Sequence, residues 1–92
     1  MITVKNKKST SNRVRPAGYE DWLDLWKQKS GNTNANISCR VPGCIWPAEA
    51  GGHVFNVNST SKEFITPLCR EHNHSSFSDT FLVSEKDLVD PN

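Results

Sequence analysis

The sequence predicts a small α+β domain that needs a disulfide or a bound metal ion for stability, and three observations support this fold class. The 92 residues are only 35% hydrophobic, so the chain forms one domain with a thin core. One amphipathic helical pattern precedes a segment with strand-like alternation. All three cysteines lie in two groups separated by a long segment. Small polar chains of this kind usually depend on disulfides or a metal ion for stability.

The cysteines and one histidine have the spacing of a metal-binding site. Four residues separate Cys39 from Cys44, and two separate Cys69 from His72. Thiolates and neutral imidazoles are the ligands that zinc prefers, and two close pairs joined by a long loop are typical of a tetrahedral structural site. We therefore predict one structural Zn²⁺ per chain, bound by Cys39, Cys44, Cys69 and His72. His74 is the alternative fourth ligand, but His72 would share a helical face with Cys69.

Residues 1–16 differ in charge from the rest of the chain. They carry five bases and no acid, which leaves six bases and ten acids for residues 17–92. We predict a flexible basic arm over residues 1–16 and a single zinc-binding domain over residues 17–92. Such an arm can follow nucleic-acid phosphates, or it can be a solvated tail. The candidate nucleic-acid contacts are Lys5, Lys7, Lys8, Arg13 and Arg15.

Residues 18–30 show the clearest helical pattern. Large apolar residues recur at i, i+3, i+4 and i+7, and acids precede bases as the helix dipole favours. These apolar residues are Tyr19, Trp22, Leu23 and Trp26, and Gly31 follows as a stop signal. We predict that this face packs on the zinc-binding module. Recognition of a base or a protein partner by the tryptophans is the alternative.

Residues 37–80 are expected to build the metal site, and residues 81–92 to form a strand and tail. A turn at Val41-Pro42-Gly43 joins the first cysteine pair into a zinc knuckle. Residues 53–57 and 63–66 are predicted strands of a β-hairpin with its turn at 58–62. A short helix is expected from Leu68 onward. Residues 81–83 are a predicted strand, and residues 88–89 can pack back onto the body.

This order of knuckle, hairpin and ligand-bearing helix resembles the treble-clef zinc finger. More narrowly, GGHV at 51–54 and ITPLCREHN at 65–73 resemble the ββα-metal module of the HNH endonuclease family, over about residues 39–80. The resemblance implies that His53 is a general base and that Asn73 contacts a second, catalytic divalent ion. His74 and Asp79 are further candidates for that ion.

The chain departs from the HNH pattern at functional positions. Gly52 stands where the family usually has a metal-binding Asp, and Phe64 stands where its middle Asn is expected. These departures favour a non-catalytic HNH-like zinc module that binds a macromolecule, either protein or nucleic acid. Small chains of this kind often act as inhibitors or adaptors, including phage-encoded ones. The alternatives are a metal-dependent endonuclease that uses His53, and a thiol switch at Cys69.

Composition argues against other classes of protein. No segment approaches the roughly 18 apolar residues that a membrane span needs, and no signal peptide is evident. Three cysteines cannot all pair as disulfides, so an oxidised secreted scaffold is not expected. We predict a reduced, cytoplasmic protein without an evident small-molecule substrate.

Overall fold

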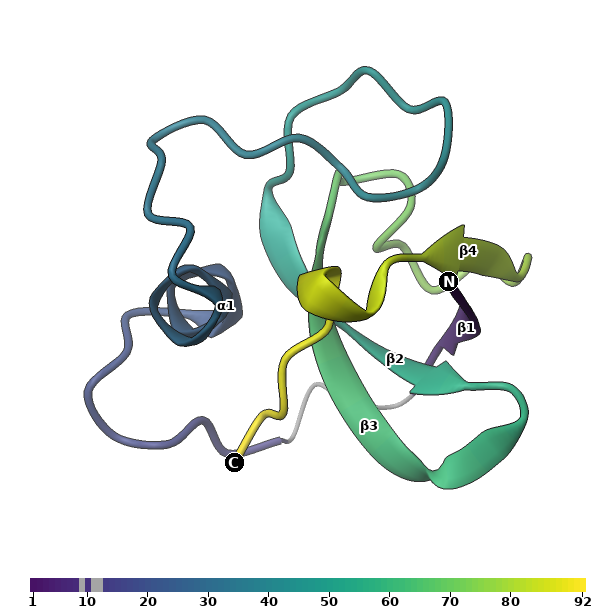
Figure 1. Ribbon diagram of the computed structural model, residues 1–92, viewed down its shortest axis with the longest axis horizontal. Helices are drawn as coiled ribbons and strands as arrows, with labels where there is room; N and C mark the ends of the chain where they lie inside the picture. The colour runs from purple at the N-terminus through teal and green to yellow at the C-terminus, as the bar shows by residue number, and fades with distance from the viewer. Residues whose placement is uncertain (9, 11–12) are drawn as a thin grey trace.

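A computed structural model describes residues 1–8, 10 and 13–92 (Figure 1). In this part of the chain, one α-helix accompanies a four-stranded antiparallel sheet of order β3-β2-β1-β4. The elements are β1 (Ile2–Asn6), α1 (Trp22–Ser30), β2 (Ala50–Asn56), β3 (Ser59–Leu68), β4 (Phe81–Val83) and the short 3-10 helix η1 (Glu85–Asp87). The predicted α+β class is confirmed. Neither helix is long and apolar enough to cross a membrane.

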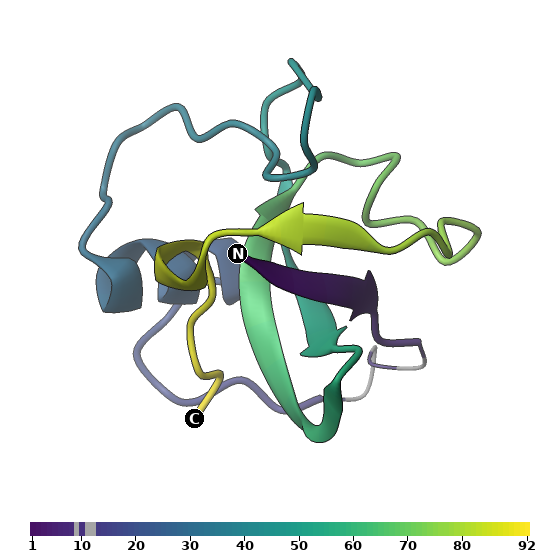
Figure 2. The ribbon, with the colours of Figure 1, turned by 45° about the vertical axis from the view of Figure 1, so that its right-hand side comes forward.

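Strand β1 lies inside the sheet, between β2 and β4 (Figure 2). Val4 pairs with Asn56 on one side and with Phe81 on the other, and its side chain is fully buried. The prediction of a flexible arm over residues 1–16 is therefore wrong for residues 2–6. The segment is too polar to predict as a strand by itself, and its partners lie 48 to 81 residues away in the sequence.

The predicted hairpin is present as β2 and β3, but its turn is tighter than expected. Asn56 pairs with Ser59, so residues 57–58 make the turn, and most of the predicted turn at 58–62 belongs to β3. The Asn56 side chain accepts a hydrogen bond from the Asn58 backbone N–H at 2.9 Å, which stabilises this reversal. The predicted strand at 81–83 is confirmed as β4.

The hairpin separates two small cores because successive strand residues point to opposite faces. Val54 and Leu68 point to the face that carries Val4, Phe81 and two of the cysteines. Ile65 points to the other face, where it packs with α1 and with Val89 near the C-terminus. Val89 also pairs with Ile65 through backbone hydrogen bonds, as expected for a tail that packs onto the body.

Helix α1 begins four residues later than predicted. Asp21 caps it, with its side chain accepting a hydrogen bond from the Asp24 N–H at 2.7 Å, and Gly31 ends it in the left-handed conformation. The helix packs on β2 and β3 through Trp26 and through Leu25, which the pattern did not single out. A Cβ atom on Gly51 would lie 2.5 Å from the Trp22 backbone, so α1 and β2 touch at a position that only glycine fits.

The prediction of a short helix from Leu68 onward is wrong. Leu68 is the last residue of β3, and residues 70–73 form a turn instead of a helix. The Asn73 N–H donates to the Cys69 carbonyl at 2.9 Å, which closes a single helical turn that does not continue. Pairing of Leu68 with Ala50 keeps the chain extended up to the ligand pair. The polar Asn-His-Ser-Ser segment that follows favours turns over a helix.

Candidate metal centre

The first ligand pair lies on a knuckle between residues 38 and 47. Ser38 and Pro47 form a bridge, and the Cys39 N–H donates to the Trp46 carbonyl at 3.0 Å. Inside this bridge the Cys44 N–H donates to the Val41 carbonyl at 3.0 Å, and Gly43 has φ +80°. Proline followed by a glycine at positive φ is typical of a type II turn. The predicted turn therefore brings the two sulfurs to one side of the loop.

The second ligand pair follows β3 directly. Cys69 is buried, and His72 lies on the turn after it. The Asn6 side chain, from β1, donates a hydrogen bond to the His72 carbonyl at 2.6 Å. The N-terminal strand therefore helps to fix the ligand turn. No sequence pattern pointed to this role of Asn6.

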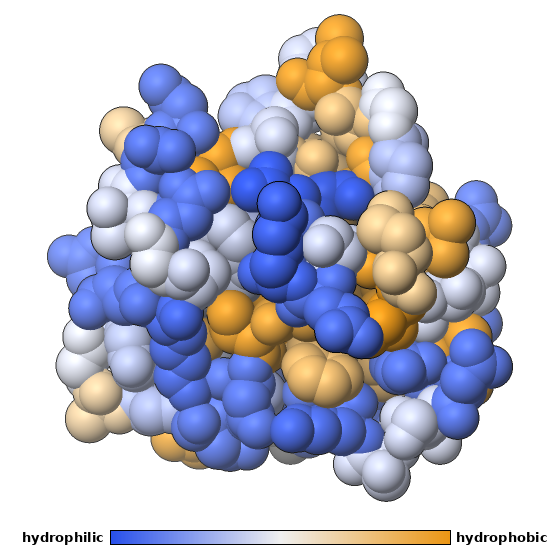
Figure 3. Space-filling view, viewed as in Figure 1, coloured by the Kyte–Doolittle hydropathy of each residue, from blue (hydrophilic) through white to orange (hydrophobic). Residues whose placement is uncertain are grey.

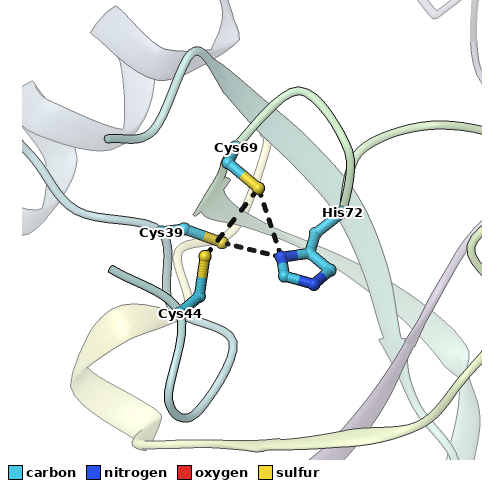
Figure 4. A group of neighbouring side chains, drawn as sticks. All are labelled: Cys39, Cys44, Cys69 and His72. Atoms are coloured by element: carbon cyan, nitrogen blue, oxygen red, sulfur yellow. Dashed lines mark hydrogen bonds between the residues drawn. The ribbon is translucent and has the colours of Figure 1, made fainter. Parts of the chain in front are cut away.

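All four predicted ligands point toward one another (Figure 4). The three sulfurs and His72 Nδ1 lie within 4.8 Å of one another. The Cys44 and Cys69 sulfurs are 3.9 Å apart, and His72 Nδ1 is 3.5 Å from Cys39 Sγ and 3.2 Å from Cys69 Sγ. A tetrahedral zinc site needs sulfur–sulfur distances of about 3.8 Å and sulfur–nitrogen distances of about 3.5 Å. The four residues are close enough to bind one metal ion, and their geometry is compatible with zinc.

The burial of this cluster affects its proton chemistry. Burial raises the pKa of the Cys39 thiol to about 11, although backbone N–H groups of Cys69 and Val41 oppose the shift. A metal ion must therefore displace a proton from this sulfur, as thiolate ligation requires. The His72 and Phe77 rings pack in a T-shaped arrangement, with centroids 4.8 Å apart. This contact holds the imidazole with Nδ1 toward the sulfurs.

A second feature lies beside the ligand turn. A pocket of about 680 Å³ is lined by residues from β1, the start of α1, β2 and the turn after Cys69. Three of its lining residues are the candidate catalytic residues His53, Asn73 and His74. Two others are the lysines of the segment after β1, Lys7 and Lys8. Residues that are distant in the sequence thus share one concave surface.

His53 is a buried and neutral member of this pocket. Its side chain is only 7% exposed, and Nε2 has no hydrogen-bond partner among the described residues. Burial is the largest cause that lowers its pKa, and the charge of Arg13 adds to the effect while Glu63 opposes it. The Trp22 ring and the imidazole pack in a T-shaped arrangement, with centroids 4.5 Å apart.

The other catalytic candidates are not arranged as a second metal site. His74 Nδ1 accepts a hydrogen bond from the Ser76 backbone N–H at 3.1 Å, so the hydrogen of the neutral ring lies on Nε2. A Cβ on Gly52 would lie 2.8 Å from Asn73 Oδ1 and 2.4 Å from Leu68, which leaves little room for a carboxylate. Asp79 does not line the pocket. In the part of the chain that the structure describes, Cys39, Cys44, Cys69 and His72 form the one His, Cys, Asp and Glu group close enough to share an ion.

The five candidate nucleic-acid contacts differ in whether they line the pocket. Lys5 belongs to β1, Arg13 forms a salt bridge with Glu63 at 2.6 Å, and Arg15 donates to the Tyr19 carbonyl at 2.7 Å. Lys8 donates to the Ser75 carbonyl, and the Lys7 Nζ lies 5.8 Å from the Phe55 ring centroid. Only these two lysines line the pocket, with both side chains exposed.

Comparison with known protein families, with curated proteins and with solved structures finds no match to this chain. The likeness to the HNH module therefore remains a resemblance in a few residues.

Proposed function

We propose that this chain is a non-catalytic, zinc-stapled module that binds a nucleic acid through the pocket beside its metal centre. The observation that carries the proposal is the convergence of Lys7, Lys8 and His74 on the pocket. Two ammonium groups and an imidazole N–H are donors, and donors of this kind contact phosphate oxygens in nucleic-acid complexes.

Zinc has a structural role in this proposal. A site with four protein ligands has no open position for a water or a substrate, which is the difference between structural and catalytic zinc. Cys39 and Cys69 belong to the buried core around Val4 and Leu68, so the ion would join the knuckle, the end of β3 and the core. The donor set of three sulfurs and one nitrogen is a soft set that suits zinc better than Mg²⁺ or Ca²⁺.

Two acidic residues also line the pocket, and each could repel a phosphate. Asp21 lines the pocket but uses its carboxylate to cap α1. Glu49 lines the pocket from the segment between the knuckle and β2. Replacing Glu49 with glutamine would remove a repulsive charge without changing the shape of the pocket.

Neutralising the two pocket lysines should weaken nucleic-acid binding and its salt dependence. Each lost phosphate contact lowers the slope of log affinity against log salt by about 0.7 for a single strand. We therefore expect the Lys7→Gln/Lys8→Gln variant to reduce this slope by about 1.4. Fluorescence anisotropy of a labelled strand, titrated at several salt concentrations, measures both quantities.

A charge-matched variant separates a local contact from an effect of net charge. Lys27→Gln/Lys86→Gln removes the same charge from residues outside the pocket and should bind like the wild type. Equal losses in both double variants would contradict a site at the pocket. Deletion of residues 1–16 is not a suitable test, because it removes β1 from the middle of the sheet.

An active metal-dependent endonuclease is the second candidate function. It is favoured by the common position of His53, Asn73 and His74 in the pocket. In this mechanism His53 would be the general base that accepts a proton from water, and its neutral, buried imidazole suits that role. A divalent ion would have to be held by Asn73 and the substrate phosphate, since Gly52 offers no ligand. His74 could join them only after its Nδ1 releases the hydrogen bond from the Ser76 N–H.

Nicking of supercoiled plasmid by the zinc-loaded protein tests this second candidate. With Mg²⁺, Mn²⁺ or Ni²⁺ added, an endonuclease should nick the plasmid, and His53→Ala should abolish the reaction with its zinc content unchanged. A non-catalytic module shows no nicking with any of these ions. Activity that persists in His53→Ala would indicate a contaminating nuclease.

A further inference from the structure

The knuckle exposes two large apolar residues on the segment that leads from its turn back to the Ser38–Pro47 bridge. Ile45 is 88% exposed and Trp46 is 66% exposed, directly after the ligand Cys44. Figure 3 shows hydrophobic atoms gathered over the loop that precedes β2. The other two tryptophans pack on the hairpin, where Trp26 is 1% exposed. The chain has few large apolar side chains to bury, yet the Trp46 indole lies in solvent. An exposed tryptophan beside another exposed apolar residue is typical of a binding surface.

A second, smaller pocket lies at the base of this tryptophan. Its volume is about 220 Å³, and Trp46 and Pro47 line it together with Cys69, Arg70, Glu71 and Glu49. This volume is below the range of about 300–1,000 Å³ that is usual for whole small-molecule ligands. It suits a single planar ring system. An indole, a proline ring and a guanidinium group are surfaces on which such a ring stacks.

The two pockets are neighbours. Glu49 lines both of them, so the pocket of Lys7 and Lys8 and the pocket of Trp46 meet at this residue. The first pocket carries two lysines as well as the acids Asp21 and Glu49. Lysines beside an exposed aromatic ring are a combination that binds single-stranded nucleic acids. Phosphates contact the cations, and unpaired bases stack on the ring. The carboxylates of Glu49 and Glu71 oppose a phosphate at the second pocket but can accept hydrogen bonds from the amino groups of bases.

We propose that Trp46 is a stacking platform for an unpaired base of a nucleic-acid strand whose phosphates contact Lys7 and Lys8. This inference rests on the proposed function and adds a preference for single strands over duplexes. Bases inside a duplex are already stacked and paired, so their faces are not accessible to an indole on a protein surface. The knuckle bridge from Cys39 to Trp46 holds the platform in place through the 3.0 Å backbone hydrogen bond.

The test compares Trp46→Ala, Trp46→Phe and wild type in their affinity for a labelled DNA strand. Three probes are used: the single strand, its duplex, and a strand of equal length made of abasic residues. Loss of one stacked base should weaken single-strand binding about 5- to 160-fold in Trp46→Ala, and Trp46→Phe should recover most of it. Leu82→Ala is the matched control, because Leu82 is also exposed but lies on β4, outside both pockets.

The abasic strand distinguishes this inference from the proposed function. It keeps the phosphates, so wild type and Trp46→Ala should bind it equally and more weakly than wild type binds the normal strand. Single-strand binding that is unchanged in Trp46→Ala, or a wild-type preference for the duplex, would overturn the stacking role while leaving the phosphate contacts intact. Absence of salt-dependent binding to all three probes would overturn the proposed function itself.

Discussion

Replacing His72 with alanine is expected to abolish metal binding and unfold the chain. His72 Nδ1 lies 3.2 Å from the Cys69 sulfur and completes the ligand set. Binding of structural zinc contributes an apparent 10–16 kcal/mol in small zinc-dependent domains, which is about as much as the whole stability of an ordinary domain. Chelation of the ion from the wild type should have the same effect. Metal content by elemental analysis and far-UV circular dichroism measure both outcomes.

His74→Ala is the matched control for this experiment. His74 lies two residues further along the same turn, but it is exposed and bonds to Ser76 instead of the sulfurs. This variant should keep its metal and its circular dichroism spectrum. If His74→Ala lost the metal and His72→Ala kept it, the assignment of the fourth ligand would be wrong. A chelated wild-type protein that stays folded would show that the core does not depend on the ion.

Replacing Trp26 with alanine should have the largest effect of any substitution outside the metal centre. Trp26 packs with Leu25, Ile65 and Val89 in the core between α1 and the hairpin. Its indole N–H donates to the Asp87 carbonyl at 3.0 Å, and its ring lies 5.4 Å from the Arg40 guanidinium carbon. Truncation of a buried tryptophan costs about 3–5 kcal/mol, which is a large share of the stability of a small domain. Urea denaturation of the zinc-loaded protein measures the loss.

Trp46→Ala is the control of the same chemistry in an exposed position. Its side chain contributes little to either core, so the free energy of unfolding should change by less than about 0.5 kcal/mol. A larger loss in Trp46→Ala than in Trp26→Ala would contradict the burial of α1 on the hairpin. The two variants also separate the roles of the tryptophans, since Trp26 is expected to affect stability and Trp46 to affect binding.

The sequence by itself determined the parts of the protein that depend on neighbouring residues. The spacing of Cys39, Cys44, Cys69 and His72 predicted the cluster, because close ligand pairs restrict where two donors can point. Proline and glycine at 42–43 predicted the knuckle turn through their allowed φ values. The hairpin and the stop of α1 at Gly31 followed from similarly local signals.

Only the tertiary structure decided where the N-terminal segment and the functional pocket lie. Residues 2–6 become a strand because β2 and β4 offer unpaired backbone groups on both sides, and no local pattern encodes partners that distant. The same strand carries Asn6 to the His72 carbonyl and places Lys7 and Lys8 beside His53. The tertiary structure also decided that β3 continues to Leu68 where a helix was expected to begin. Pairing with β2 competes there with the helical tendency of the segment. Contacts between residues far apart in the chain therefore set the candidate binding surface, whereas short-range spacing set each ligand pair of the candidate metal centre.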